Sequence, residues 1–255
     1  MKLFSPPKNS HKGQNGKLLI IGGSKKYHGA PKFSILAARR FVDLIYFYPA
    51  EKDPDLISEV KKIPEVIVID KVELLERISS CDCVLFGIGL DKAIPNGSAL
   101  LKAIIKKSKK LVIDGDGLKR IKNKIPKGSI ITPHEAEFEM LFGIEGTKEN
   151  VQKMAKSNNF IILKKGPVDS ISNGKKTLEN KIHNQGMTKG GTGDVLSGLV
   201  AALACKNDNF ASAYQGARIC GRAGNLCKKE FGYNFSASDL ADKLAIAAKR
   251  KGANK

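Results

Sequence analysis

Short apolar runs rich in β-branched and aromatic residues alternate with segments of helical periodicity along most of the chain. This alternation is typical of βα units arranged around a largely parallel sheet. We expect strands at residues 18–21, 44–48, 66–69, 84–86, 111–114, 130–132 and 161–164. Helices are expected between them at about 30–41, 72–79, 97–107, 135–142 and 147–157. The predicted fold class is therefore α/β with a mostly parallel central sheet.

The last third of the chain departs from this alternation. Residues 170–179 predict a hairpin with Asn173 and Gly174 in its turn, and helices are expected near 191–205, 210–229 and 237–250. No linker of Pro, Gly and Ser, no low-complexity segment and no repeat divides the 255 residues. We therefore expect a single domain over residues 1–255.

The chain begins MKLFSPPKNS, which lacks the apolar core of a signal peptide, and no apolar run is long enough for a bilayer. The 5 cysteines are odd in number and lack metal-binding spacing, which argues against a disulfide framework or a zinc site. We expect a soluble, cytoplasmic protein with reduced cysteines and no membrane partner.

The formal net charge of +19 raises the question of a nucleic-acid partner. The excess is carried mainly by lysines dispersed over the whole chain, Trp is absent and aromatic residues make up 6%. Specific nucleic-acid surfaces favour arginine and stacking aromatic side chains instead. We expect no specific nucleic-acid partner, although the positive field would favour a nucleotide as substrate.

Glycine-rich or polar motifs follow five of the expected strands, at residues 22–24, 87–90, 114–117, 132–135 and 164–167. Ligands of parallel sheets bind at the carboxyl ends of the strands, where such motifs collect. The sequence lacks GxxxxGK[ST], and Gly87-Ile88-Gly89 lacks the third glycine of a dinucleotide fingerprint. A P-loop NTPase and a Rossmann dehydrogenase are therefore not expected.

The run Gly190, Gly191, Thr192, Gly193 and Asp194 precedes an apolar helical segment. Glycines can turn successive N–H groups toward one point, and a helix start adds its positive dipole end, which suits a phosphate. A carboxylate beside bound phosphate is electrostatically unfavourable unless it takes part in the reaction. Asp194 is therefore a candidate general base for an attacking hydroxyl, with an ordinary first-turn acid as the alternative.

Four further side chains each have a functional and a structural interpretation. His134 could donate to a ligand oxygen or cap the helix that begins near Glu135. Asp114 and Asp116 could contact a ligand or magnesium, but we slightly prefer them as helix caps. Lys165, beside Gly166, could steady a nucleotide or be one of many surface lysines.

Seven segments, taken together and in this order, resemble one family. They are HKGQNGKLLIIGGS (11–24), YHGAP (27–31), FGIGL (86–90), DGDGL (114–118), TPHEAEF (132–138), LKKGPVDSIS (163–172) and NQGMTKGGTGDVLSG (184–198). The chain resembles the ADP- or ATP-dependent NAD(P)H-hydrate dehydratases over residues 11–225. The resemblance implies a ribokinase-like fold, with a three-layer α/β/α arrangement.

The resemblance also implies an activity. The S epimer of hydrated NADH or NADPH (NADHX or NADPHX) would be phosphorylated on its C6 hydroxyl by ADP or ATP and would then lose phosphate. The products would be NADH or NADPH, AMP or ADP, and phosphate. The rival is a small-molecule kinase for a sugar or vitamin, because kinases of this superfamily share a glycine-rich loop that ends in Asp.

The resemblance also implies roles for the residues of this chain that occupy the matching positions of the family motifs. Asp194 would be the catalytic base, and Ala30, Gly89, His134 and Asp194 would contact the hydrated dinucleotide. The nucleotide phosphates would be bound by Lys165, Gly166, Pro167, Val168, Asp169, Gly190, Gly191, Thr192 and Gly193. Mg²⁺ would be held by phosphates and water, with no metal ligand from the protein.

The resemblance further implies a homotetramer and a separate NAD(P)H-hydrate epimerase as functional partner, because 255 residues leave no room for an epimerase domain. The chain departs from the family pattern at Asp91, where glycine is common, at residues 39–43, and at Lys189, where an apolar residue is common. At Asp91 and at residues 39–43 the loops are therefore expected to differ in shape from those of the family. Lys189 could add a cation near the phosphates.

Overall fold

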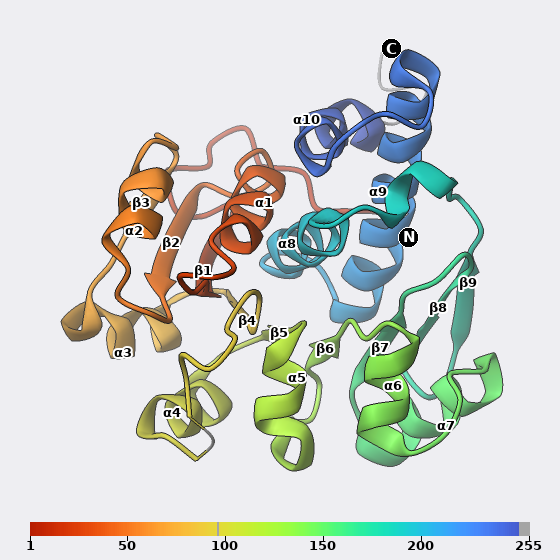
Figure 1. Ribbon diagram of the computed structural model, residues 1–255, viewed down its shortest axis with the longest axis horizontal. Helices are drawn as coiled ribbons and strands as arrows, with labels where there is room; N and C mark the ends of the chain where they lie inside the picture. The colour runs from red at the N-terminus through yellow and green to blue at the C-terminus, as the bar shows by residue number, and fades with distance from the viewer. Residues whose placement is uncertain (96, 250–255) are drawn as a thin grey trace.

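The computed structural model describes residues 1–95 and 97–249. Within them one sheet has the strand order β3-β2-β1-β4-β5-β6-β7-β8-β9 (Figure 1). The strands are β1 (Lys17–Gly22), β2 (Leu44–Pro49), β3 (Val66–Val68), β4 (Cys83–Phe86), β5 (Leu111–Ile113), β6 (Ile130–Ile131), β7 (Ile161–Lys164), β8 (Asp169–Ser172) and β9 (Thr177–Asn180). Strands β1 to β7 are parallel, and β8 and β9 pair antiparallel at one edge. The predicted α/β class is confirmed.

The central strands are apolar on both faces because helices cover both sides of the sheet. In β1, Leu18 and Ile20 pack into one core and Leu19 and Ile21 into the other, and all four are fully buried. A continuous apolar run of this kind is what a parallel sheet between two helical layers requires. The fold is therefore the three-layer α/β/α arrangement that the resemblance implied.

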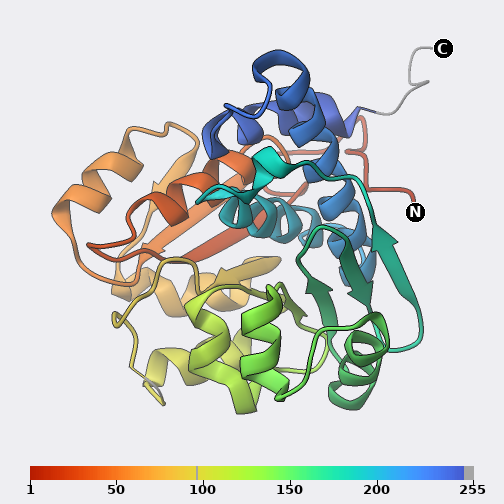
Figure 2. The ribbon, with the colours of Figure 1, turned by 45° about the vertical axis from the view of Figure 1, so that its right-hand side comes forward.

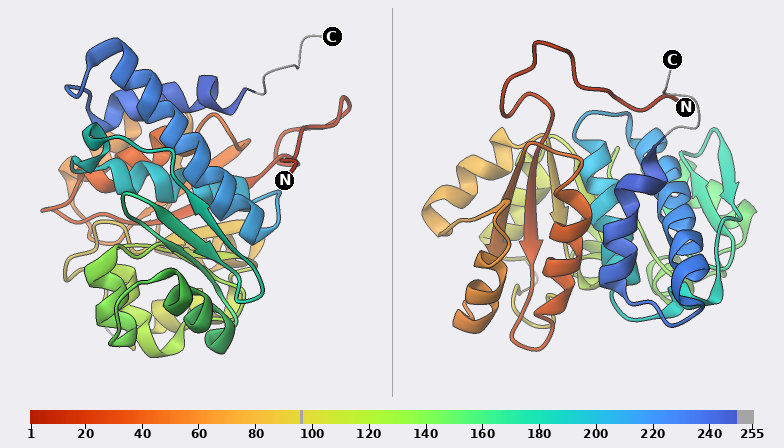
Figure 3. Two further views of the ribbon diagram at one scale, coloured as in Figure 1. Left: turned by 90° about the vertical axis from the view of Figure 1, so that its right-hand side faces the viewer. Right: turned by 90° about the horizontal axis from the view of Figure 1, so that it is seen from above.

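Two helical layers enclose the sheet (Figures 2 and 3). One core is shared with α1 (Gly29–Ala38), α2 (Pro54–Lys61), α8 (Thr192–Ala204), α9 (Asn209–Phe231) and α10 (Ala237–Ala248). The other is shared with α3 (Lys71–Ser80), α4 (Ala99–Lys107), α5 (Asp116–Ile121), α6 (Glu135–Phe142) and α7 (Lys148–Asn158). Short 3₁₀ turns lie at η1 (Lys122–Lys124) and η2 (Gln185–Thr188).

The predicted strands and the hairpin are confirmed, with Gly174 at φ +83° in the turn. Two helices were missed. Helix α2 has clear start signals, since Asp53 caps it and Pro54 occupies its first turn, and α5 is only 6 residues long. The last helix was predicted to reach residue 250, and the domain was predicted to reach residue 255. Residues 250–255 lie outside the residues that the structure describes. Of the described helices, none combines the length and apolar character that a membrane crossing requires.

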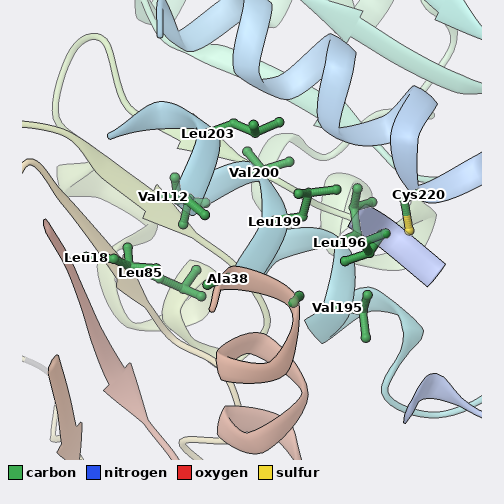
Figure 4. Close-up of a cluster of buried hydrophobic side chains, with 14 of the residues drawn as sticks. Leu18, Ala38, Leu85, Val112, Val195, Leu196, Leu199, Val200, Leu203 and Cys220 are labelled. Atoms are coloured by element: carbon green, nitrogen blue, oxygen red, sulfur yellow. The ribbon is translucent and has the colours of Figure 1, made fainter. Parts of the chain in front are cut away.

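Helix α8 lies between α1 and α9 and packs on the sheet (Figure 1). Figure 4 shows its side chains Leu196, Leu199 and Val200 gathered with Leu85 of β4 and Cys220 of α9. The approach of α8 to α1 is very close, because a Cβ on Gly198 would lie 2.5 Å from the carbonyl oxygen of Ser34. The Ser34 hydroxyl also donates to the Asp194 carbonyl oxygen at 2.8 Å, which fixes the first turn of α8 against α1.

We expect Gly198→Ala to destabilise the protein although alanine is the better helix former. The added methyl group would meet the backbone of α1, and such overpacking costs about 1–3 kcal/mol, more than the roughly 1 kcal/mol of helix propensity gained. Urea unfolding should show a net loss of up to about 2 kcal/mol. Gly190→Ala is the control, since a Cβ there meets nothing within 4 Å; an equal effect of both changes would contradict the packing argument.

Candidate active site

The ends of the parallel strands are tied together at one edge of the sheet. Gly23, after β1, donates its N–H to the carbonyl oxygen of Ile88, after β4, at 2.8 Å. Gly87 has φ +118°, and a Cβ there would lie 2.2 Å from the carbonyl oxygen of Asp114, so the turns after β4 and β5 touch. Lys165, after β7, donates its N–H to Pro133, after β6, at 2.8 Å. The five predicted strand-end motifs therefore share one edge.

The glycine-rich run forms the start of α8 at this edge. Gly191 is the N-cap with φ +90°, and a Cβ there would lie 2.5 Å from the ring of Phe33, so glycine is required. The Thr192 hydroxyl donates to the carbonyl oxygens of Met187 and Lys189 at 2.7 and 2.8 Å. Within the described residues, the N–H groups of Gly193 and Asp194 have no acceptor. Free amides at a helix start form a site for an anion.

Asp194 lies in the first turn of α8, and its carboxylate accepts no hydrogen bond from the described residues. Burial is the largest of the effects that raise the pKa of Asp194 to about 7; the charges of Asp114 and Glu137 act in the same direction, and Lys165 opposes them. A carboxylate that binds a proton near neutral pH is suited to general base catalysis. This geometry is compatible with the base that the sequence predicts.

Lys165 is the cation of this cluster. Its ammonium donates to the Asp114 carboxylate at 2.8 Å and lies 4.0 Å from that of Glu137. A Cβ on Gly193 would lie 3.6 Å from the same ammonium, so Lys165 reaches the start of α8. Burial by itself lowers the pKa of Lys165, but Asp114 and Glu137 outweigh it and raise the pKa above its usual value. Lys165 therefore remains charged.

The structural interpretation of His134 is confirmed. The His134 ring accepts the N–H of Glu137 at 3.3 Å, and the Glu137 carboxylate accepts the N–H of His134 at 2.9 Å, which forms a capping box at the start of α6. The His134 side chain is exposed and also lines the cavity described next. Capping and ligand contact are thus compatible at this position.

A cavity of about 380 Å³ opens beside Lys165 and the start of α8. Its polar side holds Lys165, Gly166, Asp169, Thr192 and Gly193. Its apolar wall, which the sequence analysis missed, consists of Ile182, Met187, Leu196, Ala217 and Cys220. Pro167, His183 and Thr188 also line it, whereas Val168 is exposed outside the lining. The wall comes from α8, α9 and residues 182–187. Met187 and Leu196 fall within the segment 184–198 that carries the resemblance, whereas Ile182, Ala217 and Cys220 lie outside all seven segments.

Asp169 shapes the polar side of the cavity. Its carboxylate accepts the N–H of Gly166 at 3.1 Å and the side-chain amide of Asn180 at 2.9 Å, which folds residues 166–169 into a tight turn. Burial raises the pKa of Asp169, against the lowering effect of these two hydrogen bonds.

The predicted substrate contacts Ala30, in the first turn of α1, and Gly89, after β4, lie together. Gly89 has φ +59°, and a Cβ there would lie 3.0 Å from the Cβ of Ala30. Neither residue lines the cavity. Of the predicted substrate contacts, Ala30 and Gly89 therefore lie away from the cavity, whereas His134 lines it together with the predicted nucleotide residues.

The capping interpretation of Asp114 and Asp116 is wrong. The N-cap of α5 is Gly115, and no side chain caps that helix. Asp114 is instead buried as the partner of Lys165, because a carboxylate in this position needs a counter-charge. Asp116 accepts the N–H of Asp91 at 3.1 Å and the ammonium of Lys119 at 3.0 Å.

Two of the three departures from the family pattern, Asp91 and Lys189, have local explanations. Asp91 has φ +48°, the left-handed conformation that glycine adopts most easily, and Asp116 and Arg120 hold its backbone. The Lys189 ammonium donates to the carbonyl oxygens of Tyr233 and Phe235, both at 2.7 Å. It thus fastens the loop to the segment before α10, which argues against the phosphate role suggested by the sequence.

A glycine-rich helix start with an acid, placed over the strand ends of a three-layer sheet, defines the ribokinase-like class. A ribokinase-like superfamily protein from Enterococcus faecalis aligns over 96% of this chain and 90% of its own, with a TM-score of 0.82 at 24% identity. The ADP/ATP-dependent NAD(P)H-hydrate dehydratase from Bacillus subtilis aligns over 95% and 92%, with a TM-score of 0.80 at 22% identity.

The family model described as NAD(P)H-hydrate dehydratase matches residues 18–245, and the chain belongs to that family. A bifunctional NAD(P)H-hydrate repair enzyme from Methanocaldococcus jannaschii is 39% identical, with 92% of this chain covering 48% of that protein. The ADP-dependent (S)-NAD(P)H-hydrate dehydratase from Cenarchaeum symbiosum is 35% identical, with 95% of this chain covering 91% of that one. The chain thus spans about half the length of the bifunctional relatives.

We expect Asp194→Asn to stabilise the protein, increasingly so at higher pH. Because folding raises the pKa of Asp194 from about 3.8 to about 7, its contribution to stability is present below pH 4 and is lost as pH rises through 7. Urea unfolding should show the advantage of the Asn variant growing between pH 4 and 7 and then levelling off, at or above about 1.4 kcal/mol. A pH-independent difference would contradict the raised pKa.

Proposed function

We propose that this protein catalyses the ADP-dependent, or ATP-dependent, dehydration of the S epimer of NADHX or NADPHX. The observation that carries the proposal is the unpartnered Asp194 carboxylate beside the free amides of Gly193 and Asp194. Family membership supplies the substrate class. Residues 1–255 act as a single domain in this proposal.

In the proposed reaction, Asp194 accepts the proton of the C6 hydroxyl as that oxygen attacks the terminal phosphoryl group of the nucleotide. The new O–P bond replaces the bond to AMP, or to ADP when ATP is the donor. The amides at the α8 start stabilise charge on the transferring group. Phosphate, a better leaving group than hydroxide, then departs with the electron pair of the C6–O bond. A proton leaves the adjacent ring carbon C5 to solvent, and its bonding electrons form the C5–C6 double bond of NAD(P)H.

In this proposal the cavity and the contact between Ala30 and Gly89 have separate roles, and His134 at the cavity lies where the two ligands meet. The cavity holds the nucleotide. Its phosphates lie near Lys165, residues 166–169 and residues 190–193, and its adenine ring lies against the apolar wall. Ala30, Gly89 and His134 contact the hydrated dinucleotide. The close packing at Gly89 and the exposure of His134 support this assignment.

The co-substrate is the magnesium complex of the nucleotide. In this proposal the phosphates and water hold the Mg²⁺. The proposal also includes a cytoplasmic homotetramer, a separate epimerase as functional partner, and no specific nucleic-acid partner. A sugar or vitamin kinase is the weaker alternative, because the family match covers residues 18–245.

Recovery of NADH absorbance from NADHX tests the reaction. With Mg²⁺ and ADP or ATP, the wild-type protein should restore the absorbance and release one AMP or ADP per NADH. Asp194→Asn should lower kcat at least about 100-fold, because it removes the base and keeps the shape. Binding of the nucleotide, measured by calorimetry, should persist in this variant. No NADH recovery with either nucleotide would refute the proposal.

The pH profile tests the base. Only ionised Asp194 can take the proton, so kcat/KM should rise about tenfold per pH unit below 7 and level off above it. The measurement is kcat/KM for NADHX from pH 5.5 to 8.5 at saturating nucleotide. A flat profile over this range would exclude Asp194, with its pKa near 7, as the group that limits the rate.

A further inference from the structure

Three carboxylates at the strand ends compete for one ammonium. Asp114 follows β5, Glu137 belongs to α6, and Asp194 begins α8, and all three act on the same Lys165, which follows β7. These are the charged groups that face Asp194. With one cation and three acids, the way the ammonium is shared determines which carboxylate can take up a proton.

Asp114 holds the ammonium. The Lys165 ammonium lies 2.8 Å from Asp114 but 4.0 Å from Glu137, and the Asp114 side chain is only 5% exposed. Both backbones are fixed, since Asp114 donates its N–H to Phe86 and Lys165 donates its N–H to Pro133. Glu137 is occupied by the N–H of His134 in the capping box. Asp194 alone of the three has no hydrogen-bond partner among the described residues.

The position of the Lys165 ammonium matters because a direct ion pair between Lys165 and Asp194 would make Asp194 a poor base. A charge-assisted hydrogen bond from an ammonium stabilises the ionised carboxylate and weakens its affinity for a proton. Lys165 reaches the start of α8, so an unanchored ammonium could make that bond. In the structure the ammonium donates to Asp114 instead.

We propose that Asp114 is a positioning residue that anchors the Lys165 ammonium and so leaves the Asp194 carboxylate free to accept a proton. The proposal rests on the proposed function only in naming that proton as the one on the substrate hydroxyl. It gives the buried Asp114–Lys165 ion pair a role beyond stability. Asp114 itself touches no substrate in this account.

Two effects of Asp114→Asn act in the same direction. The change removes a like charge that raises the pKa of Asp194, and it releases Lys165 to pair with Asp194. Both effects lower the pKa of Asp194. Glu137→Gln removes a like charge that raises the pKa of Asp194 less than Asp114 does, and it keeps a residue that can complete the capping box. It should act in the same direction but less strongly.

Carbon-13 NMR of the free protein, labelled at the aspartate carboxyl carbons, tests the proposal without any substrate. The Asp194 signal is the one that is absent from the spectrum of the Asp194→Asn variant. In the wild-type protein it should titrate near pH 7. In Asp114→Asn the acid dissociation constant of Asp194 should increase at least tenfold. Asp116→Asn is the matched control, because Asp116 pairs with Lys119 outside the cluster and should leave the titration unchanged.

Kinetics supply the second readout. In Asp114→Asn the rising limb of kcat/KM should move to lower pH by the same amount as the NMR titration, and the plateau should fall because the base is weaker. An unchanged Asp194 titration in both folded Asp114→Asn and folded Glu137→Gln would overturn the proposal. A shifted titration in a protein that recovers no NADH would support the anchoring by Asp114 and refute only the proposed function.

Discussion

The packing of α8 against α1 is the constraint on which the site depends. Gly198 lets the two helices approach to backbone contact, and the Ser34 hydroxyl holds the carbonyl of Asp194. Because the first turn of α8 is thereby fixed over the strand ends, its free amides and the Asp194 carboxylate have a defined direction. Preorganised donors of this kind need no rearrangement when charge develops on a bound phosphoryl group.

The fold could be predicted from the sequence because its determinants are local. Buried parallel strands need continuous apolar runs, and the chain contains them in order. Helix α5 was missed because Asp116 and Gly117 also suit a turn, and at 6 residues it has no periodicity to recognise. The loop at residues 190–194 could be found because glycines beside an acid are unusual. The Asp114–Lys165 pair joins residues 51 positions apart and leaves no local signal, so capping was preferred for Asp114.

Net charge describes this site poorly. The chain carries +19 overall, yet the groups that act on Asp194 are two carboxylates and one ammonium, so burial and local acids raise its pKa. Lys189, the lysine next to the glycine-rich run, is turned to backbone carbonyls near α10. The dispersed lysines thus set a general attraction for anions, whereas the reactivity of the site depends on a few contacts of about 3–4 Å.

An unpartnered, largely buried carboxylate is unfavourable for folding, and this follows from its use. A hydrogen bond or ion pair that satisfied Asp194 would stabilise the ionised form and remove its affinity for a proton. Asp114 is spared the cost of an unpaired buried charge because it takes the Lys165 ammonium, and the apolar contacts of α8 with the sheet and α9 hold its first turn in place. The site therefore separates two tasks that one carboxylate cannot combine: Asp114 satisfies the cation, and Asp194 stays reactive.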